Sequence, residues 1–186
     1  MAKAVRDAQG EKKLRMAVMS STVSGWLEVA GSVLLAIAAE PIHEAGHAAA
    51  AWSVTGVWPD IGFWAVHPTV PFRSNADMLV VLGAGDLALI AWWGLMLLIA
   101  NLRTERRWVL IGPTFVLTLA LVNWLATAIL SPFGYGHLGA SDAAKFMALS
   151  GLAPWTVAAA VTGIIALVGM TFARIFRSTG EASPAL

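Results

Sequence analysis

The sequence predicts an all-α integral membrane protein with about four transmembrane helices and a short non-helical or β-hairpin segment after the first. The hydrophobic fraction is 58% and the charged fraction only 12%, whereas a soluble domain carries about a quarter charged residues. Nine Trp accompany a single Tyr, and indole rings collect at membrane interfaces. A chain of 186 residues has room for one membrane-embedded domain.

Four stretches are long and apolar enough to cross about 30 Å of hydrocarbon. The predicted spans are residues 26–52, 78–100, 108–130 and 153–172. The first span is unusual because several ionisable side chains lie in it. Pro41 is expected to kink this helix or to open a local turn, because proline cannot donate the backbone hydrogen bond of a helix interior.

The distribution of basic residues predicts the orientation of the spans. Ten of the twelve Lys and Arg residues lie before the first span, between the second and third, or after the fourth, and only Arg73 and Lys145 lie in the other loops. Basic residues are enriched in cytoplasmic loops. We therefore expect a protein of the cell membrane with both termini in the cytoplasm, residues 1–15 forming a cytoplasmic segment and residues 178–186 a flexible tail.

Two loops are predicted on the outer side. Residues 56–77 are rich in aromatic residues and proline and alternate between Ile61 and Val66, which favours a short hairpin or re-entrant segment covered by protein. Residues 131–151 begin with a glycine-rich stretch and continue as a short helix that starts near Ser141 and Asp142.

Composition also narrows the function. The net charge is +1 and there is no concentrated basic arm, so no nucleic-acid partner is expected. The chain has no cysteine, which excludes disulfides, thiolate metal sites and cysteine nucleophiles. Any metal ion would have to be held by His, Asp or Glu.

The first span contains the sequence His43-Glu44-Ala45-Gly46-His47. Histidines four residues apart share one face of a helix, at a spacing that allows both imidazoles to bind one Zn²⁺ with bonds of about 2.0–2.1 Å. Glu44 lies about 100° further round the helix and is the candidate general base, taking a proton from water activated by the metal. Ionisable groups within a span are costly and are usually functional.

A catalytic zinc uses three protein ligands, and the residues alone leave the third one open. The candidates are Asp142, Asp86, His137 and His67. Asp142 could instead be a first-turn acid on a helix capped by Ser141. Asp86 lies within the second span, where it could orient a zinc-bound histidine through a hydrogen bond. The two remaining histidines are expected to be loop residues.

The stretch from His43 to Trp52, closed by Thr55-Gly56, resembles the site-2 protease family of zinc intramembrane proteases. Leu82-Gly83-Ala84-Gly85-Asp86 is similar to the glycine-rich start of that family's next core helix, and Gly139-Ala140-Ser141-Asp142-Ala143 lies where the family supplies an aspartate ligand. The resemblance implies a zinc site of His43, His47 and Asp142, with Asp86 in a supporting role. Asp142 is followed here by Ala143, where the family has Gly.

The leading hypothesis is a membrane-embedded zinc metalloprotease that hydrolyses a peptide bond within or next to the bilayer, with Glu44 as catalytic residue and a membrane protein or peptide as substrate. A zinc hydrolase of a lipid amide would use the same groups. A transporter built on Glu28, Glu40 and Asp86 is the alternative from another class, although transport does not require metal-ligand spacing. The sequence does not predict an oligomeric state.

Overall fold

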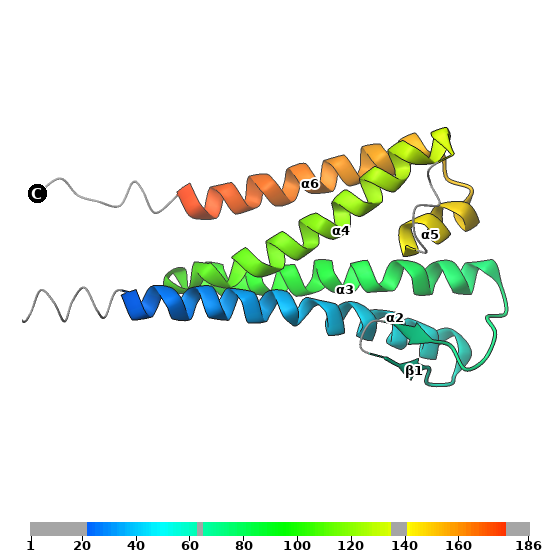
Figure 1. Ribbon diagram of the computed structural model, residues 1–186, viewed down its shortest axis with the longest axis horizontal. Coiled ribbons are helices and arrows are strands. Elements are labelled where there is room, and N and C mark those ends of the chain that lie inside the picture. Colours follow the sequence, from blue (N-terminus) through cyan, green and yellow to red (C-terminus); the bar gives the residue numbers. More distant parts are fainter. Residues whose placement is uncertain (1–21, 63–64, 135–140, 178–186) are drawn as a thin grey trace, which may run out of the picture.

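The computed structural model describes residues 22–62, 65–134 and 141–177 (Figure 1). Its elements, after a helical segment at residues 22–37, are α2 (Ala39–Thr55), β1 (Asp60–Ile61), β2 (Val66–His67), α3 (Asn75–Leu102), η1 (Thr104–Leu110), α4 (Ile111–Leu130), η2 (Ser131–Phe133), α5 (Asp142–Ser150) and α6 (Pro154–Arg177). The predicted residues 1–15 and 178–186 lie outside the described residues, as does His137.

The four predicted spans and the hairpin are confirmed. The helices long and apolar enough to cross a membrane are Thr22–Thr55, Asn75–Leu102, Arg106–Phe133 and Pro154–Arg177. The first three extend a few residues beyond both predicted bounds, and the fourth begins one residue later than predicted and ends five residues later, because the helices continue past the apolar stretch to their caps. The Ser74 side chain accepts a hydrogen bond from the Asp77 amide at the start of α3, and Gly56 ends α2 with a left-handed φ of 76°.

The first span is interrupted at Ala38, between the segment 22–37 and α2. Pro41 has no amide hydrogen and its ring crowds the carbonyl four residues earlier, at Ile37. The chain nevertheless stays helical in direction, because Ala38 donates to the Leu34 carbonyl at 2.9 Å and accepts from Ile42 at 3.3 Å. The predicted local turn at Pro41 is therefore a mild one, located three residues before the proline.

The long helices form two packed pairs. α2 runs along α3, while α4 crosses the bundle diagonally and packs against α6 (Figure 1). A Cβ atom on Gly46 would lie 2.5 Å from the Ala84 carbonyl oxygen and 2.7 Å from the Ala88 Cβ. The absence of a side chain at Gly46 thus lets α2 approach the backbone of α3 closely, which fixes the part of α2 that carries the two histidines.

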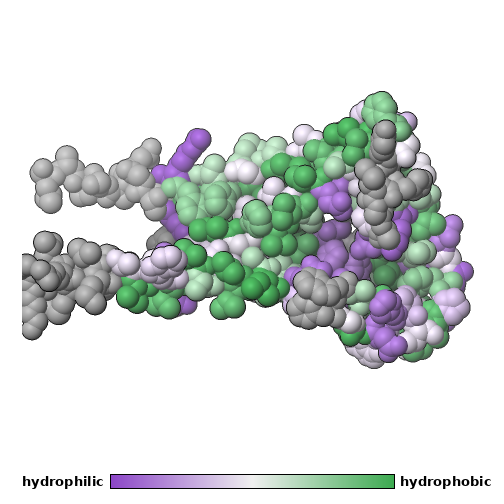
Figure 2. All heavy atoms as spheres, in the orientation of Figure 1, coloured by the Kyte–Doolittle hydropathy of each residue, from purple (hydrophilic) through white to green (hydrophobic). Residues whose placement is uncertain are grey.

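The outer surface of the long helices is apolar. Large exposed side chains occur on all four, among them Leu34, Leu87, Phe115 and Leu167. Hydrophobic residues predominate along the middle of the bundle, and hydrophilic residues gather around the end formed by α5 and the hairpin and near the end of α6 (Figure 2). This distribution suits a protein surrounded by lipid, in which apolar side chains face the hydrocarbon.

The hairpin lies beside the end of α2 (Figure 1). Its two strands pair antiparallel, with Asp60 opposite His67 and Ile61 opposite Val66, and the Gly62 amide donates to the Ala65 carbonyl at 2.8 Å. α5 lies at the same end of the bundle and packs against α3 and α4. The hairpin and α5 therefore cover the end of the bundle toward which His43 and His47 are displaced.

Candidate metal centre

His43 and His47 lie one turn apart on α2 and face α3. Gly85 of α3 stands directly behind the two rings: a Cβ atom there would lie 2.6 Å from His43 Cε1 and 2.7 Å from His43 Nδ1, and would also collide with His47 Nε2. These distances are well inside ordinary contact. Glycine at this position is therefore what makes room for both imidazoles between the helices.

The His47 ring is held by the backbone of α3. Its Nδ1 lies 2.6 Å from the carbonyl oxygen of Val81, and because a carbonyl can only accept, Nδ1 must carry the hydrogen. In the neutral ring the lone pair is then on Nε2. The side chain is buried, with 5% of its surface exposed, so this lone pair points into the protein with a fixed direction.

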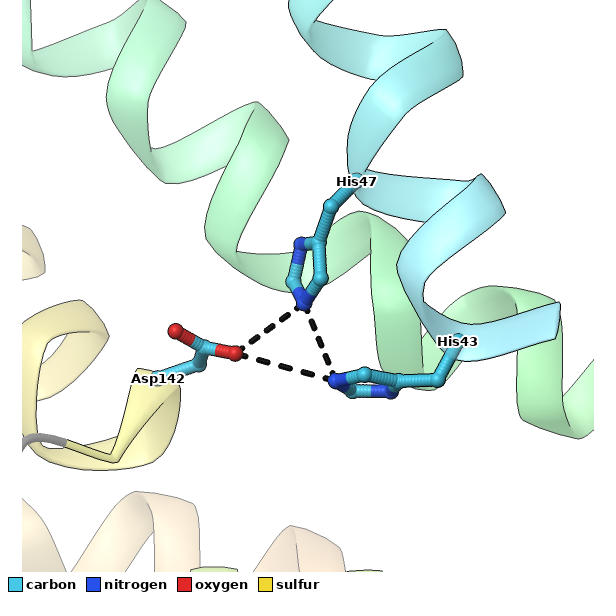
Figure 3. Close-up of side chains that lie close together, drawn as sticks. All are labelled: His43, His47 and Asp142. Carbon is cyan, nitrogen blue, oxygen red and sulfur yellow. Dashed lines mark hydrogen bonds and ion pairs between the residues drawn. The ribbon is translucent and has the colours of Figure 1, made fainter. Parts of the chain in front are cut away.

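Asp142 is the first residue of α5 and meets the two histidines from the other side (Figure 3). Ser141 caps this helix by accepting a hydrogen bond from the Ala144 amide at 3.3 Å, so Asp142 is a first-turn acid on a capped helix and at the same time lies next to both histidines. Burial acts to raise the pKa of Asp142, but the adjacent imidazoles of His43 and His47 and the charge of Lys145 outweigh it, so the pKa of this carboxyl lies well below its usual range. Asp142 is therefore an anion, as metal ligation requires.

The three side chains present one atom each to a common point. His47 Nε2 lies 3.0 Å from His43 Nε2 and 3.0 Å from Asp142 Oδ2, and His43 Nε2 lies 3.7 Å from Asp142 Oδ2 (Figure 3). Ligand atoms around a tetrahedral zinc with bonds of about 2.0–2.1 Å are separated by about 3.3 Å. The observed triangle therefore has the dimensions of one face of such a site.

Two acceptor atoms of this triangle face each other at short range. The His47 Nε2 lone pair and the carboxylate oxygen of Asp142 are both acceptors, yet they lie 3.0 Å apart. Two facing acceptors repel unless a metal ion or a second proton on the imidazole lies between them. Among the residues that the structure describes, His43, His47 and Asp142 are the group of His, Asp and Glu side chains close enough together to hold a metal ion.

Asp86 lies behind His43, away from this triangle. Its Oδ1 is 3.8 Å from His43 Nδ1, and its Oδ2 accepts a hydrogen bond of 2.7 Å from Trp124 Nε1. His43 Nδ1 is buried without a hydrogen-bond partner. Asp86 thus faces the nitrogen that a metal-bound His43 would leave free, although 3.8 Å exceeds the length of a hydrogen bond.

Glu44 points into a cleft beside the triangle. The cleft has a volume of about 310 Å³ and is lined by Glu44, His47, Asp142, Lys145 and residues of the hairpin including Val66. Glu44 is itself buried, with 7% of its surface exposed. Glu44, the candidate general base, and two candidate metal ligands therefore line one cavity together with Val66 of β2.

The other ionisable candidates lie elsewhere. His67 is exposed on β2, where its backbone pairs with Asp60, and it does not belong to the candidate metal group. Glu28 is exposed on the first span and Glu40 is half-buried one turn before Glu44.

Sequence reasoning did not find the Val81 carbonyl or Trp124. A backbone acceptor leaves no trace in the sequence. Trp124 did offer a signal, because an indole N–H in the middle of a span needs an acceptor, and Asp86 is a membrane-embedded acid that needs a donor.

No protein-family model, curated protein or solved structure matches this chain. The likeness to site-2 proteases consequently rests on the motifs in the chain itself.

Proposed function

We propose that the chain is a membrane-embedded zinc metalloprotease that hydrolyses a peptide bond within or next to the bilayer. The observation that carries the proposal is the convergence of His43 Nε2, His47 Nε2 and Asp142 Oδ2 at separations of 3.0–3.7 Å beside a cavity that also contains Glu44. Three protein ligands with an open fourth position are the pattern of catalytic rather than structural zinc sites.

The metal would be held by the two imidazoles and the carboxylate. When bound, zinc would lower the pKa of water to about 7 and polarise the scissile carbonyl. Two histidines and a carboxylate also suit Fe(II). Glu44, directly after His43 in sequence, favours hydrolysis, because a metalloprotease needs a carboxylate next to its histidine pair and a redox site does not.

The protein's own groups would provide the proton transfers. Glu44 would accept a proton from the attacking water and pass it to the leaving amine. The Val81 carbonyl, 2.6 Å from His47 Nδ1, would fix the ring orientation, as hydrogen-bonded neighbours of metal-binding histidines do.

A substrate peptide bond would have to lie in the cleft in an extended form. The cleft is bordered by β2 and adjoining residues such as Ala65 and Pro68, and β2 is paired on one edge only, with β1. An extended peptide could add to the other edge through backbone hydrogen bonds. This favours a membrane protein or peptide that is locally unwound.

Metal analysis of the purified protein tests the centre. We expect about one zinc per chain in the wild type and none in a His43→Ala, His47→Ala double variant, measured by elemental analysis for zinc and iron together. Unchanged metal content in the double variant would exclude the site. Iron in place of zinc would contradict the proposed zinc centre.

Glu44→Gln separates binding from catalysis. This variant should retain the metal but cleave a panel of transmembrane-helix substrates about 10²–10⁴-fold more slowly, because the imidazoles remain and the base is lost. Full activity of Glu44→Gln would contradict the mechanism while leaving the metal site intact.

A zinc hydrolase of a lipid amide is the second candidate, and one feature favours it. An apolar cavity of about 500 Å³ between α3, α4 and α6 reaches Asp86, which lies 3.8 Å from His43, and the volume is typical of a small-molecule site. Ala120 lines the cavity. If a lipid chain occupied it, Ala120→Trp would abolish hydrolysis of fatty-acid amides and leave peptide cleavage unchanged.

A further inference from the structure

A second polar pocket lies at the opposite end of the bundle from the candidate metal centre. It has a volume of about 380 Å³, and its polar lining consists of Asn101, Arg107, Thr171 and Arg174. These residues come from the end of α3, from η1 and from the last turns of α6. From Gly85 to Asn101 the distance along α3 is about 24 Å at 1.5 Å per residue, so this basic pocket is separate from the centre.

Arg107 is the unusual member of the basic pocket. Its Nε and Nη1 atoms are buried and have no hydrogen-bond partner. Buried N–H groups of a guanidinium are costly without a partner, because each of them loses its hydration. Among the side chains that the structure describes, no carboxylate lines the pocket and none forms an ion pair with either arginine.

The chemistry of the pocket selects an anion with several oxygen atoms. A guanidinium group presents its N–H groups in a planar fork that matches phosphate and carboxylate oxygens. Arg174 adds a second positive charge, and the side chains of Asn101 and Thr171 add neutral hydrogen-bond donors at the same opening. A phosphate group has four oxygens in a tetrahedral arrangement and can contact two guanidinium groups from different directions, whereas the two oxygens of a carboxylate lie in one plane.

The position of the pocket indicates where the phosphate comes from. It lies where two membrane-spanning helices end, at Leu102 and Arg177, and hydrophilic residues reappear there beyond the apolar middle of the bundle (Figure 2). Leu97, one turn further into the span than Asn101, contributes to an apolar lining. A pocket with a polar opening and an apolar inner lining fits a lipid, whose charged headgroup is joined to apolar acyl chains.

We propose that the basic pocket binds a phosphate group, supplied by the headgroup of an anionic phospholipid in the leaflet that contacts this end. The guanidinium of Arg107 contacts the phosphate oxygens from within the bundle, and Arg174 contacts them from the surface. Basic pockets between transmembrane helices are known to bind anionic headgroups in this way.

Native mass spectrometry of the full chain in detergent tests the proposal, with phosphatidylglycerol and phosphatidylcholine as probes. We expect phosphatidylglycerol to bind more tightly than phosphatidylcholine. An Arg107→Gln, Arg174→Gln double variant should lose about 30-fold in affinity for phosphatidylglycerol, the effect of two basic residues at a membrane surface. Equal binding of the two lipids by the wild type would overturn the proposal.

A matched control distinguishes the pocket from the general positive charge of this end. Arg103 and Arg106 are exposed neighbours that do not line the pocket, and their replacement by Gln changes the net charge equally. We expect this control to retain most of the affinity. Equal losses of phosphatidylglycerol affinity in the two double variants would indicate a diffuse electrostatic attraction and would refute a specific binding pocket.

Two further measurements test the proposal without a variant at Arg107. Arg174 is exposed, so Arg174→Gln should fold even if a variant at Arg107 does not, and it should weaken phosphatidylglycerol binding about 5-fold. Unchanged binding in this variant would contradict the proposal. Inorganic phosphate at millimolar concentration should not displace the lipid, and displacement would identify free phosphate as the ligand instead. None of these measurements depends on the metal centre.

Discussion

Replacing Gly85 by alanine should disrupt the candidate metal centre without touching any of its ligands. The added Cβ would lie 2.6 Å from His43 Cε1 and would collide with His47 Nε2. Carbon atoms in contact prefer about 3.5–4.0 Å, so the rings or the helices must move apart by about 1 Å. Either movement distorts a triangle whose sides are 3.0, 3.0 and 3.7 Å.

The magnitude follows from the cost of overpacking. Inserting a methyl group into a packed site costs about 1–3 kcal/mol. If that strain is relieved at the expense of metal binding, zinc affinity falls about 5- to 150-fold, at 1.4 kcal/mol for each factor of ten. Titration of the metal-free protein with zinc in competition with a chelator would measure the loss.

Gly83→Ala is the matched control for this experiment. It lies two residues earlier on α3, and a Cβ atom there would meet only Phe146 Cε2, at an ordinary 3.8 Å. Both substitutions gain the same helix propensity, about 1 kcal/mol, so a difference between them reports the site. Unchanged zinc affinity in Gly85→Ala, or equal losses in both variants, would refute the reasoning.

Two other predictions concern the ligands and the orientation. Asp142→Ala should lose zinc as severely as His47→Ala. Asp86→Ala should weaken zinc binding only about 10–100-fold, because Asp86 lies behind His43 instead of on the metal side. The same zinc titration measures all three variants, and the reverse order would identify Asp86 as the ligand. The distribution of Lys and Arg predicts that the hairpin end lies outside the cell. A cysteine introduced at exposed Asn75 should therefore react with an impermeant thiol reagent on intact cells. A cysteine introduced at exposed Arg103 should react only after lysis. The chain has no cysteine of its own, so only the introduced cysteine is labelled. Labelling in the opposite pattern would show that the orientation is the reverse of the predicted one.

The helices could be predicted because lipid imposes a simple rule on sequence. A span needs about 20 apolar residues, and the four stretches stand out even where a proline interrupts one of them. The bounds were less predictable, because they depend on capping by single residues. Ser74 fixes the start of α3 through one hydrogen bond, and Gly56 fixes the end of α2 through one left-handed backbone conformation.

The residues of the candidate site also differ in how far the sequence could predict them. His43, Glu44 and His47 are local in sequence, so helical geometry alone brings them to adjacent positions. Asp142 is 95 residues beyond His47, and its place opposite the histidines depends on how α5 packs against α3 and α4. Residue types could name Asp142 only as one of four candidates. The Val81 carbonyl could not be named at all, because every residue has one.

The separation of the ligands along the chain has a consequence for biosynthesis. His43 and His47 enter the membrane with the first span, but Asp142 is synthesised only after the third, on α5 (Figure 1). A nascent chain that has inserted its first span would carry two candidate metal ligands and the candidate base Glu44 without the third candidate ligand. If the site is a protease, hydrolytic activity would begin only when α5 docks, so the insertion machinery would not be exposed to a working enzyme while the chain is being made.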